Sequence, residues 1–530
     1  MSSAQATWPS TKAVFVNGTA LKKFALYGLI ALIAGLYLFP FVRVLSGATD
    51  EGLYIYAAQE AAEGAIPGRD FIQENPPGAY YWLAWFFRLF GSSMITARAV
   101  LFLTGIATVL VVFYLARRIG SHGIFAVTFL LTTSIPLTPI NSPHYDSNLF
   151  ALLAFAIFLI GIDSTSHGPI KYWPFVVAGV LAGWASCILQ QKGFLFLAAF
   201  VAASFFLYRK RGIRPSLLMV SSYAAVLVAE IVPYILWGAL PDLFFSTVKM
   251  PLAGYNNVNH VTYGFPLWTV WFPGLFGHLR LTPSVLLTAP ILAAMSLPFL
   301  LMLVLPLLLG VMGYIWRPQA FEHRLIPYWI AGYAMWLSEL HRQDMSHFRN
   351  GCILLVVLFF ALCERFGTRL FKQAAFAVAL GALLMGTTDL NGTLHARQPI
   401  VTRRGTLLAQ RKDPVIDFLL AHTHPGDYAF IYPYSPVYYF LADVRNPTRF
   451  NVIVDQRKSP LILEAIRDLD AKKPRYAIAQ TALLGDGMQT VFPAYRPPAP
   501  KDRMIDKYLD ENYHQVAFEN GFRFLERNSE

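Results

Sequence analysis

Long apolar runs separated by short polar stretches occupy most of the first 390 residues of the chain. They lie at residues 24–45, 97–115, 122–137, 147–162, 173–188, 194–208, 215–237, 285–311, 325–340, 350–363 and 373–388. A helix rises 1.5 Å per residue, so a run of about 17–25 residues can cross the hydrocarbon of a bilayer. Several runs are near this lower limit. The pattern predicts a mainly α, polytopic membrane helical bundle with about 11 spans, and about 11–13 are compatible with it.

The pattern changes after residue 390. Charged residues become more frequent, and the long apolar runs end. Short strand-like runs alternate there with helical stretches, at residues 413–422, 428–432, 461–470, 476–479 and 515–518. Such alternation is typical of a small α/β domain. We therefore divide the chain into a transmembrane module, residues 1–390, and a C-terminal α/β domain, residues 391–530.

The composition supports a membrane protein. Hydrophobic residues make up 55% of the 530 residues and charged residues only 14%, whereas a soluble globular chain carries about 25% charged residues. The formal net charge is +12, but basic residues in short loops are orientation signals of membrane proteins, so we expect no nucleic-acid partner. The cysteines Cys187, Cys352 and Cys363 all lie in apolar runs, which argues against a disulfide framework.

Basic residues gather on one side of the bundle if successive spans alternate in direction. They are Lys22, Lys23, Arg117, Arg118, Lys171, Arg209, Lys210, Arg211, Arg214, Arg317, Arg324, Arg365, Arg369 and Lys372. Short cytoplasmic loops are enriched in such residues, so this side is predicted to face the cytoplasm. An odd number of spans then places the N-terminus in the cytoplasm and the C-terminal domain outside the cytoplasmic (inner) membrane.

Two adjacent acids, Asp50 and Glu51, open the polar loop after the first span. Charged groups at the edge of hydrocarbon are costly and usually functional. In a transferase that joins a sugar to a hydroxyl, such a carboxylate can accept the hydroxyl proton. The alternative is that Asp50 caps the helix that follows, because Asp is a favoured N-cap residue. We favour the catalytic interpretation for Asp50, with Glu51 supporting its orientation.

The second outer loop, residues 141–148, carries Asp146 and His144 at the mouth of the next span. Asp146 is again either a helix cap or a functional acid. Carboxylates that converge from two loops can share proton transfer and acceptor positioning, or can chelate a divalent cation. Asp146 is therefore the third catalytic candidate, His144 a further site candidate, and a divalent cation a candidate cofactor.

Two basic residues on the outer side are candidates for binding a phosphate. Lys192 lies between two short spans, where the orientation rule disfavours an outer Lys. It either contacts phosphate as a point charge or snorkels to the interface. Arg342 belongs to the polar run His341–Arg349, and a guanidinium fork matches phosphate oxygens. For this run the alternative is an ordinary polar loop.

The same run contains further site candidates, Asp344 and His347. The His-x-x-Asp and Asp-x-x-His spacings are compatible with metal ligation, but His341 and His347 lie six residues apart, unlike a helical His-Glu-x-x-His motif. We therefore assign no metal ligands from the sequence. Glu230, an acid within a span, is the last candidate. It either lines the donor pocket or pairs with a basic residue.

A fixed order of motifs runs through the transmembrane module. One span is followed by the acids Asp50 and Glu51, by GAIPGRDF, ENPPGAYYWLAWFFRLFG and ARAV, and later by Asp146, QKG around Lys192, and HRQDMSHF. This order resembles the GT-C superfamily of membrane glycosyltransferases, near the protein O-mannosyltransferases and the lipid A aminoarabinose transferases. The resemblance covers residues 20–360 and is most specific over residues 46–120.

The resemblance implies an inverting hexosyl or pentosyl transfer from a polyprenyl-phosphate donor to a hydroxyl of a lipid, glycan or protein at the outer membrane face. It implies that Asp50 is the catalytic base, that Asp146 matches the acid of the second loop, and that Lys192 lies near the donor phosphate. Residues 391–530 do not match the β-trefoil insert of eukaryotic O-mannosyltransferases, which favours a bacterial cell-envelope enzyme.

Two rival functions are compatible with such a chain. A secondary transporter often shows inverted repeats and broken helices at the membrane midplane, whereas here the polar residues gather in the outer loops and no half-to-half similarity is visible. A surface-polysaccharide polymerase or ligase would share the donor chemistry.

Overall fold

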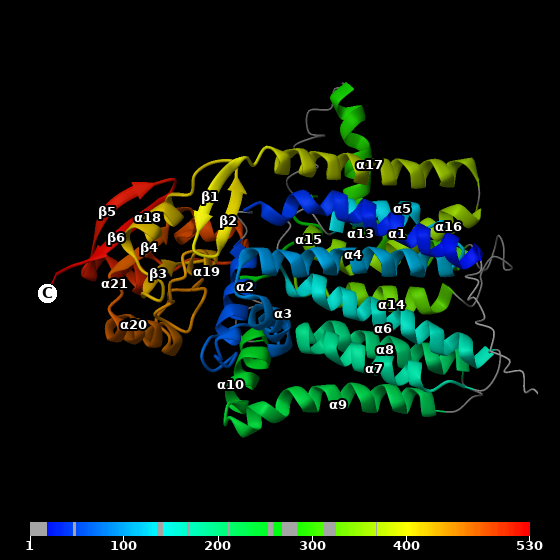
Figure 1. The fold of residues 1–530 in the computed structure, drawn as a ribbon, viewed down its shortest axis with the longest axis horizontal. Helices are drawn as coiled ribbons and strands as arrows, with labels where there is room; N and C mark the ends of the chain where they lie inside the picture. Colours follow the sequence, from blue (N-terminus) through cyan, green and yellow to red (C-terminus); the bar gives the residue numbers. More distant parts are fainter. Residues whose placement is uncertain are drawn as a thin grey trace, which may run out of the picture.

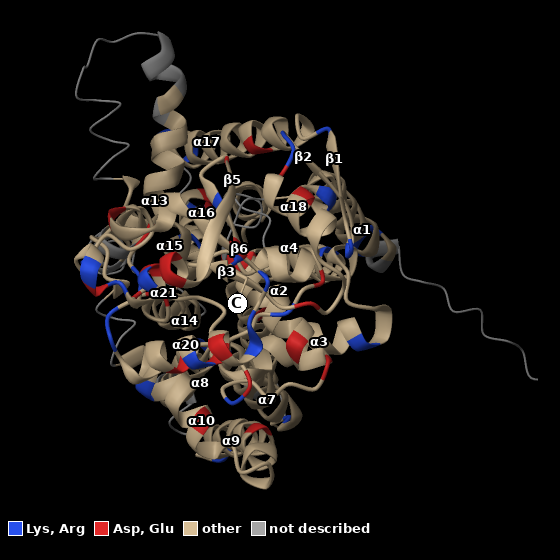
Figure 2. Ribbon diagram, turned by 90° about the vertical axis from the view of Figure 1, so that its left-hand side faces the viewer, with Lys and Arg blue, Asp and Glu red and all other residues tan. Residues whose placement is uncertain are grey.

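The structure is a computed structural model in which helices lie side by side and a strand-containing domain covers one end (Figure 1). It describes the residues 18–45, 49–134, 141–166, 170–208, 213–252, 258–267, 283–311, 325–366 and 368–529. Figure 2 looks onto the end that carries the strands and shows acidic and basic residues intermingled across that face.

The predicted apolar runs all coincide with helices. These are α1 (Gly18–Leu38), α4 (Met94–Arg118), α5 (Ile124–Phe129), α6 (Pro143–Ser166), α7 (Trp173–Ile188), α8 (Gln190–Tyr208), α9 (Arg214–Leu236), α13 (Pro283–Val311), α14 (Leu325–Leu337), α16 (Ile353–Phe366) and α17 (Arg369–Leu394). Among the described residues, five helices are long and apolar enough to cross a membrane, or six if the bent pair Met345–Gly351 and Ile353–Arg365 is one span. The full number of spans stays a prediction.

Small residues bring the helices of the bundle into close contact. Helix α7 carries Gly179 and Gly183, a spacing that lets helix backbones approach each other in a membrane. A Cβ atom at Gly179 would lie 2.3 Å from the carbonyl oxygen of Met219 in α9. In the same way, a Cβ at Gly381 of α17 would lie 1.8 Å from the carbonyl oxygen of Pro290 in α13. Larger residues at these positions would push the helices apart.

The C-terminal domain combines two small sheets with short helices. Strands β1 (Gln398–Thr402) and β2 (Gly405–Ala409) form an antiparallel pair. The second sheet has the order β3-β4-β6-β5, in which β3 is parallel to β4 and the other pairs are antiparallel. Its strands are β3 (Ala429–Tyr432), β4 (Tyr476–Gln480), β5 (Tyr513–Glu519) and β6 (Phe522–Arg527). The helices are α18 (Pro414–His422), α19 (Val437–Leu441), α20 (Pro460–Lys472) and α21 (Met504–Asn512).

The predicted α/β character of this domain is confirmed. The strand-like runs at residues 428–432, 476–479 and 515–518 overlap β3, β4 and β5, and the two predicted helical stretches overlap α18 and α20. Helix α17 continues to Leu394 and β1 begins at Gln398, so the predicted domain boundary after residue 390 falls in the last turn of α17.

Four shorter helices accompany the long helices of the bundle. They are α2 (Thr49–Ala62), α3 (Pro77–Phe90), α10 (Leu240–Phe244) and α15 (Met345–Gly351), and Figure 1 shows α2, α3 and α10 at the end where the two parts meet. Helix α2 packs tightly on α19, because a Cβ at Gly52 would lie 2.2 Å from the backbone nitrogen of Val437. The ring of Tyr56 stacks on Tyr439 with centroids 5.1 Å apart. Helix α2 therefore belongs to both cores.

The predicted inner and outer loops separate in the structure. At positions predicted to be cytoplasmic, Arg118 pairs with Asp163, and Glu364 accepts hydrogen bonds from Ser121 Oγ (3.0 Å) and the His122 amide (2.7 Å). The segments predicted to be outside contact one another and the α/β domain instead, as described below. This grouping agrees with the alternation inferred from the basic residues, while the side that faces the cytoplasm stays a prediction.

Glu51 joins three segments through a buried ion pair. Its carboxylate lies 2.6 Å from Nη2 of Arg98 in α4, and each side chain is 1% exposed. The other carboxylate oxygen accepts a hydrogen bond from the backbone amide of Asn141 (3.0 Å). Arg98 also donates to the carbonyl oxygen of Phe41 (3.2 Å). The pair thus fixes the start of α2 against α4 and the second outer loop.

Removal of one partner from this pair should be strongly destabilising. We expect Arg98→Leu to lower the free energy of unfolding by about 3–5 kcal/mol, because Glu51 would be left as a buried, uncompensated charge. Arg69→Ala is the matched control, since its ion pair with Asp70 is exposed (45% and 35%) and exposed pairs contribute little to stability. Thermal unfolding of both variants in detergent checks this, and equal midpoints would contradict it.

Candidate active site

A second buried ion pair lies where two outer loops meet. Lys192, in the first turn of α8, places Nζ 2.6 Å from Oε1 of Glu339, just after α14, and both side chains are 0% exposed. Lys192 also donates to Oδ1 of Asn148 in α6.

The local chain geometry explains why Lys192 points inward. Helix α7 ends at Ile188 and α8 begins at Gln190, so the chain reverses there with almost no loop. A Cβ at Gly193 would lie 2.1 Å from the carbonyl oxygen of Ala182, which shows how closely the start of α8 presses on α7. Glycine is required at this contact, and Lys192 beside it is enclosed by protein.

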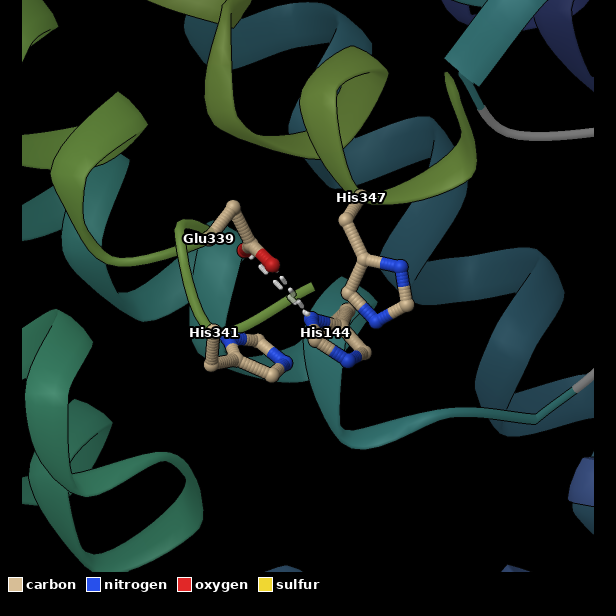
Figure 3. Close-up of side chains that lie close together, drawn as sticks. All are labelled: His144, Glu339, His341 and His347. Carbon is tan, nitrogen blue, oxygen red and sulfur yellow. Dashed lines mark hydrogen bonds and ion pairs between the residues drawn. The ribbon is translucent and has the colours of Figure 1, made fainter. Parts of the chain in front are cut away.

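Three imidazole rings surround the Glu339 carboxylate (Figure 3). Nδ1 of His144 lies 3.1 Å from Oε2 of Glu339. The His144 ring is nearly parallel to His341, with centroids 5.9 Å apart, and perpendicular to His347, at 4.9 Å. One candidate ligand atom from each of these four side chains lies within 4.8 Å of all the others. This cluster, His144–Glu339–His341–His347, is called the His₃Glu cluster below.

Asp344 connects the His₃Glu cluster to Arg342. Its carboxylate caps α15 by accepting from the His347 amide (3.0 Å), and it also contacts Nδ1 of His347 (2.8 Å) and Nε of Arg342 (2.5 Å). Burial raises the pKa of Asp344, but His347 and Arg342 outweigh it, so this pKa is far below its ordinary value. Arg342 further donates to Asn259 and to the carbonyl oxygen of Val491 (2.8 Å). The guanidinium thus reaches the α/β domain.

Asp50 lies in the first turn of α2 and is exposed. Its carboxylate accepts a hydrogen bond from the hydroxyl of Tyr434 (2.5 Å), in the α/β domain. Glu74, at the start of the ENPPG segment, is partly buried. Burial, together with the charge of Asp50, raises the pKa of Glu74 to about 7. The two carboxyl groups therefore interact at this position.

Asp146 is buried between two helices. Its carboxylate accepts hydrogen bonds from the hydroxyl of Tyr54 in α2 (2.8 Å) and from Oγ1 of Thr104 in α4 (3.2 Å). Tyr54 lies one helical turn after Asp50, so the two residues share a face of α2. Asp146 and Asp50 are thus linked through α2, although they come from different loops.

Glu230 contacts the start of helix α3. In α9, its carboxylate accepts a hydrogen bond from the backbone amide of Gly78 (2.9 Å), in the first turn of α3. A carboxylate is favoured at a helix N-terminus, where backbone amides lack partners. In this structure Glu230 therefore stabilises the packing of α3 on α9 rather than pairing with a basic residue.

A polar cavity of about 520 Å³ lies between α2 and the α/β domain. Its lining includes Glu60 and Glu63 of α2 and, across from them, Arg445, Arg449 and Lys472. The lining residue nearest to Asp50 along α2 is Tyr56, six positions or about 9 Å away along the helix.

The structure brings together several residues predicted from different loops. Lys192, His144, Asp344 and His347 converge around Glu339. Sequence reasoning missed Glu339 because its ion-pair partners Lys192 and His144 lie more than 140 positions away along the chain. Glu74 was also missed. It lies in a motif that was recognised, but its unusual proton affinity arises only from burial and from the neighbouring Asp50.

Comparisons with known proteins agree with this architecture. Residues 74–237 match the family model described as dolichyl-phosphate-mannose-protein mannosyltransferase. The structure resembles that of ArnT from Cupriavidus metallidurans bound to undecaprenyl phosphate, with 13% identity, a TM-score of 0.53, and coverage of 96% of this chain and 98% of that one. The chain has the GT-C glycosyltransferase fold. The predicted resemblance and fold class are confirmed.

The same GT-C fold recurs in a second group of solved structures. AglB, the oligosaccharyltransferase of Archaeoglobus fulgidus in complex with an inhibitory peptide and a dolichol-phosphate, matches with 11% identity and a TM-score of 0.51, over 96% of this chain and 75% of that one. Its apo form matches with 12% identity and a TM-score of 0.53. A search of curated sequences found no match. Fold and apolar helices together establish a multi-pass membrane protein.

Because the pKa of Glu74 is raised in the folded protein, its contribution to the free energy of unfolding depends on pH. Because the folded state holds this proton more tightly, the stabilisation is fully present below about pH 4.5 and is lost as the pH rises to about 7. Glu74→Gln has no carboxyl group to titrate, so the variant does not lose stability in this way as the pH rises. We expect its stability relative to the parent protein to rise by up to about 1.4 kcal/mol per pH unit over this interval and to level off above it. Unfolding midpoints between pH 4.5 and 8 measure this, and a constant difference would contradict it.

Proposed function

We propose that the protein is an inverting glycosyltransferase that moves a sugar from a polyprenyl-phosphate donor to a hydroxyl of a lipid, glycan or protein acceptor. We place the reaction at the outer face of a bacterial cytoplasmic membrane, with the N-terminus inside and the α/β domain outside. The observation that carries the proposal is the gathering of Asp50, Asp146 and Lys192 at the end of a GT-C fold that the α/β domain covers.

Asp50 is assigned the role of general base. Its carboxylate is exposed to incoming substrate, while Tyr434 fixes its orientation. It would accept the proton of the acceptor hydroxyl as the acceptor oxygen attacks the anomeric carbon from the side opposite the phosphate. The bond from carbon to phosphate oxygen breaks, and the configuration at carbon inverts. Glu51 and Asp146 hold α2, and hence Asp50, in position.

The departing phosphate is assigned to Lys192 and Arg342. A phosphate leaving group requires fixed positive charge more than a proton. Lys192 has three N–H donors, of which Glu339 and Asn148 occupy two. Arg342 has five, and three different groups accept from it. Arg342 therefore retains donors for phosphate oxygens, whereas Lys192, which is fully buried, would act on the phosphate through its charge.

The comparisons support the donor class without deciding the sugar or the acceptor. ArnT was solved with undecaprenyl phosphate, and AglB with a dolichol-phosphate and an inhibitory peptide. The fold also favours a transferase over a secondary transporter. A polysaccharide polymerase or ligase would use the same donor chemistry and differ only in its acceptor.

Asp50→Asn tests the proposal. The substitution preserves size but removes the base, so we expect the rate of sugar transfer from a radiolabelled polyprenyl-phosphate donor to envelope acceptors to fall about 10²–10⁴-fold. Asp417→Asn is the control, because Asp417 is also an exposed acid in the first turn of a helix, α18. If Asp50 only stabilises its helix, the rate of sugar transfer should change little in either variant. Activity of Asp50→Asn above about a tenth of the parent rate would refute the base assignment.

A further inference from the structure

The His₃Glu cluster combines four side chains that are typical metal ligands on three separate segments. His144 begins α6, Glu339 and His341 follow α14, and His347 lies on α15. Figure 3 shows the three rings and the carboxylate facing a common centre. Their candidate ligand atoms lie within 4.8 Å of one another. Imidazole and carboxylate together are a ligand set of zinc-type ions.

Two of the histidines are oriented as metal-binding histidines are. In metal sites, each imidazole usually uses one ring nitrogen for a hydrogen bond to a carboxylate or carbonyl, which fixes the other nitrogen toward the ion. Here Nδ1 of His347 contacts Asp344 (2.8 Å), and Nδ1 of His341 contacts the carbonyl oxygen of Ser338 (3.3 Å). In these two rings Nε2 is then the nitrogen available as a ligand. Nδ1 of His144 lies 3.1 Å from Oε2 of Glu339, so these two atoms are the candidate ligand atoms of His144 and Glu339.

We propose that His144, Glu339, His341 and His347 bind a zinc-type transition-metal ion. The ion would join the second outer loop to the loop that carries Arg342, and would thereby fix both relative to Lys192. Tetrahedral Zn²⁺ holds its ligand atoms about 3.3 Å apart, so binding draws the four side chains closer together. Glu339 can bind the ion with Oε2 while Oε1 remains paired with Lys192. This proposal does not depend on the identity of the glycosyl donor.

The competing account is that Glu339 serves only as a counter-ion for Lys192 and a protonated histidine. Both accounts use the same contacts, so metal binding is the measurement that distinguishes them. The two accounts also assign different roles to Asp344. If an ion is present, Asp344 orients His347 for coordination; without an ion, it only caps α15 and pairs with Arg342.

The experiment measures metal bound by the full-length protein, purified in detergent through a tag without histidines. The protein is stripped with a chelator, incubated with Zn²⁺ or Co²⁺, and freed of excess metal. We expect about one ion per chain by elemental analysis, and tetrahedral visible absorption bands with Co²⁺. His341→Gln and His347→Gln should each lose most of this metal. His395→Gln, at an exposed histidine that bonds within its own helix, should retain it.

Asp344→Asn separates coordination from folding. Asn preserves the helix cap but weakens the carboxylate–histidine contact, so Zn²⁺ affinity should fall about 10–100-fold with little change in the unfolding midpoint of the metal-free protein. If the parent protein binds neither ion after reconstitution, or if both histidine variants retain the parent stoichiometry, the proposal is wrong. Binding of Mg²⁺ or Ca²⁺ in place of Zn²⁺ would also overturn it.

Discussion

Carboxylates enclosed by helices must find cations inside the protein, and this constraint organises the end of the bundle where the α/β domain sits. Glu51 and Glu339 are both fully buried, and each pairs at 2.6 Å with a basic side chain that is equally buried. Removal of a single charge from such a pair is far more costly than the pair itself is favourable. The outer loops are consequently tied to particular helices rather than free to move over the surface.

The two ion pairs connect different parts of the candidate site. Glu51 with Arg98 joins α2, α4 and the second outer loop, and α2 in turn carries Asp50 and packs on α19. Lys192 with Glu339 joins α8 to the segment that continues into Arg342 and Asp344. The assigned base and the assigned phosphate cations therefore lie on elements whose positions are fixed by buried charge, which is what catalysis by preorganised electrostatics requires.

The fold could be predicted from the sequence to a large extent, because period and composition are local properties. Each apolar run became a helix, and the strand-like run 476–479 became β4 in the domain that was expected there. The site was predictable only in part. Asp50 and Lys192 stand out as charges beside apolar runs, whereas Glu339 lies near the end of the run 325–340 without any distinguishing motif. Its importance arises from Lys192 and His144, which only the tertiary structure brings close.

The spacing of residues along the sequence also does not predict a metal site whose candidate ligands come from separate segments. His341 and His347 are six residues apart, which does not match a helical metal motif, and no spacing relates them to His144 or Glu339. The structure places all four around one centre. For Glu230, an acid inside a span, the sequence could not predict the hydrogen bond that its carboxylate accepts from the amide of Gly78.

The central claim is that the outer loops and the α/β domain build one reaction site on the non-cytoplasmic side of the membrane. Fusions after the final strand to alkaline phosphatase and to a reporter that is active only in the cytoplasm test it most directly. Our account predicts an active phosphatase fusion and a silent cytoplasmic reporter, with the opposite result for fusions after Arg118. A silent phosphatase with an active cytoplasmic reporter at the C-terminus would place the whole site on the wrong side and contradict the account.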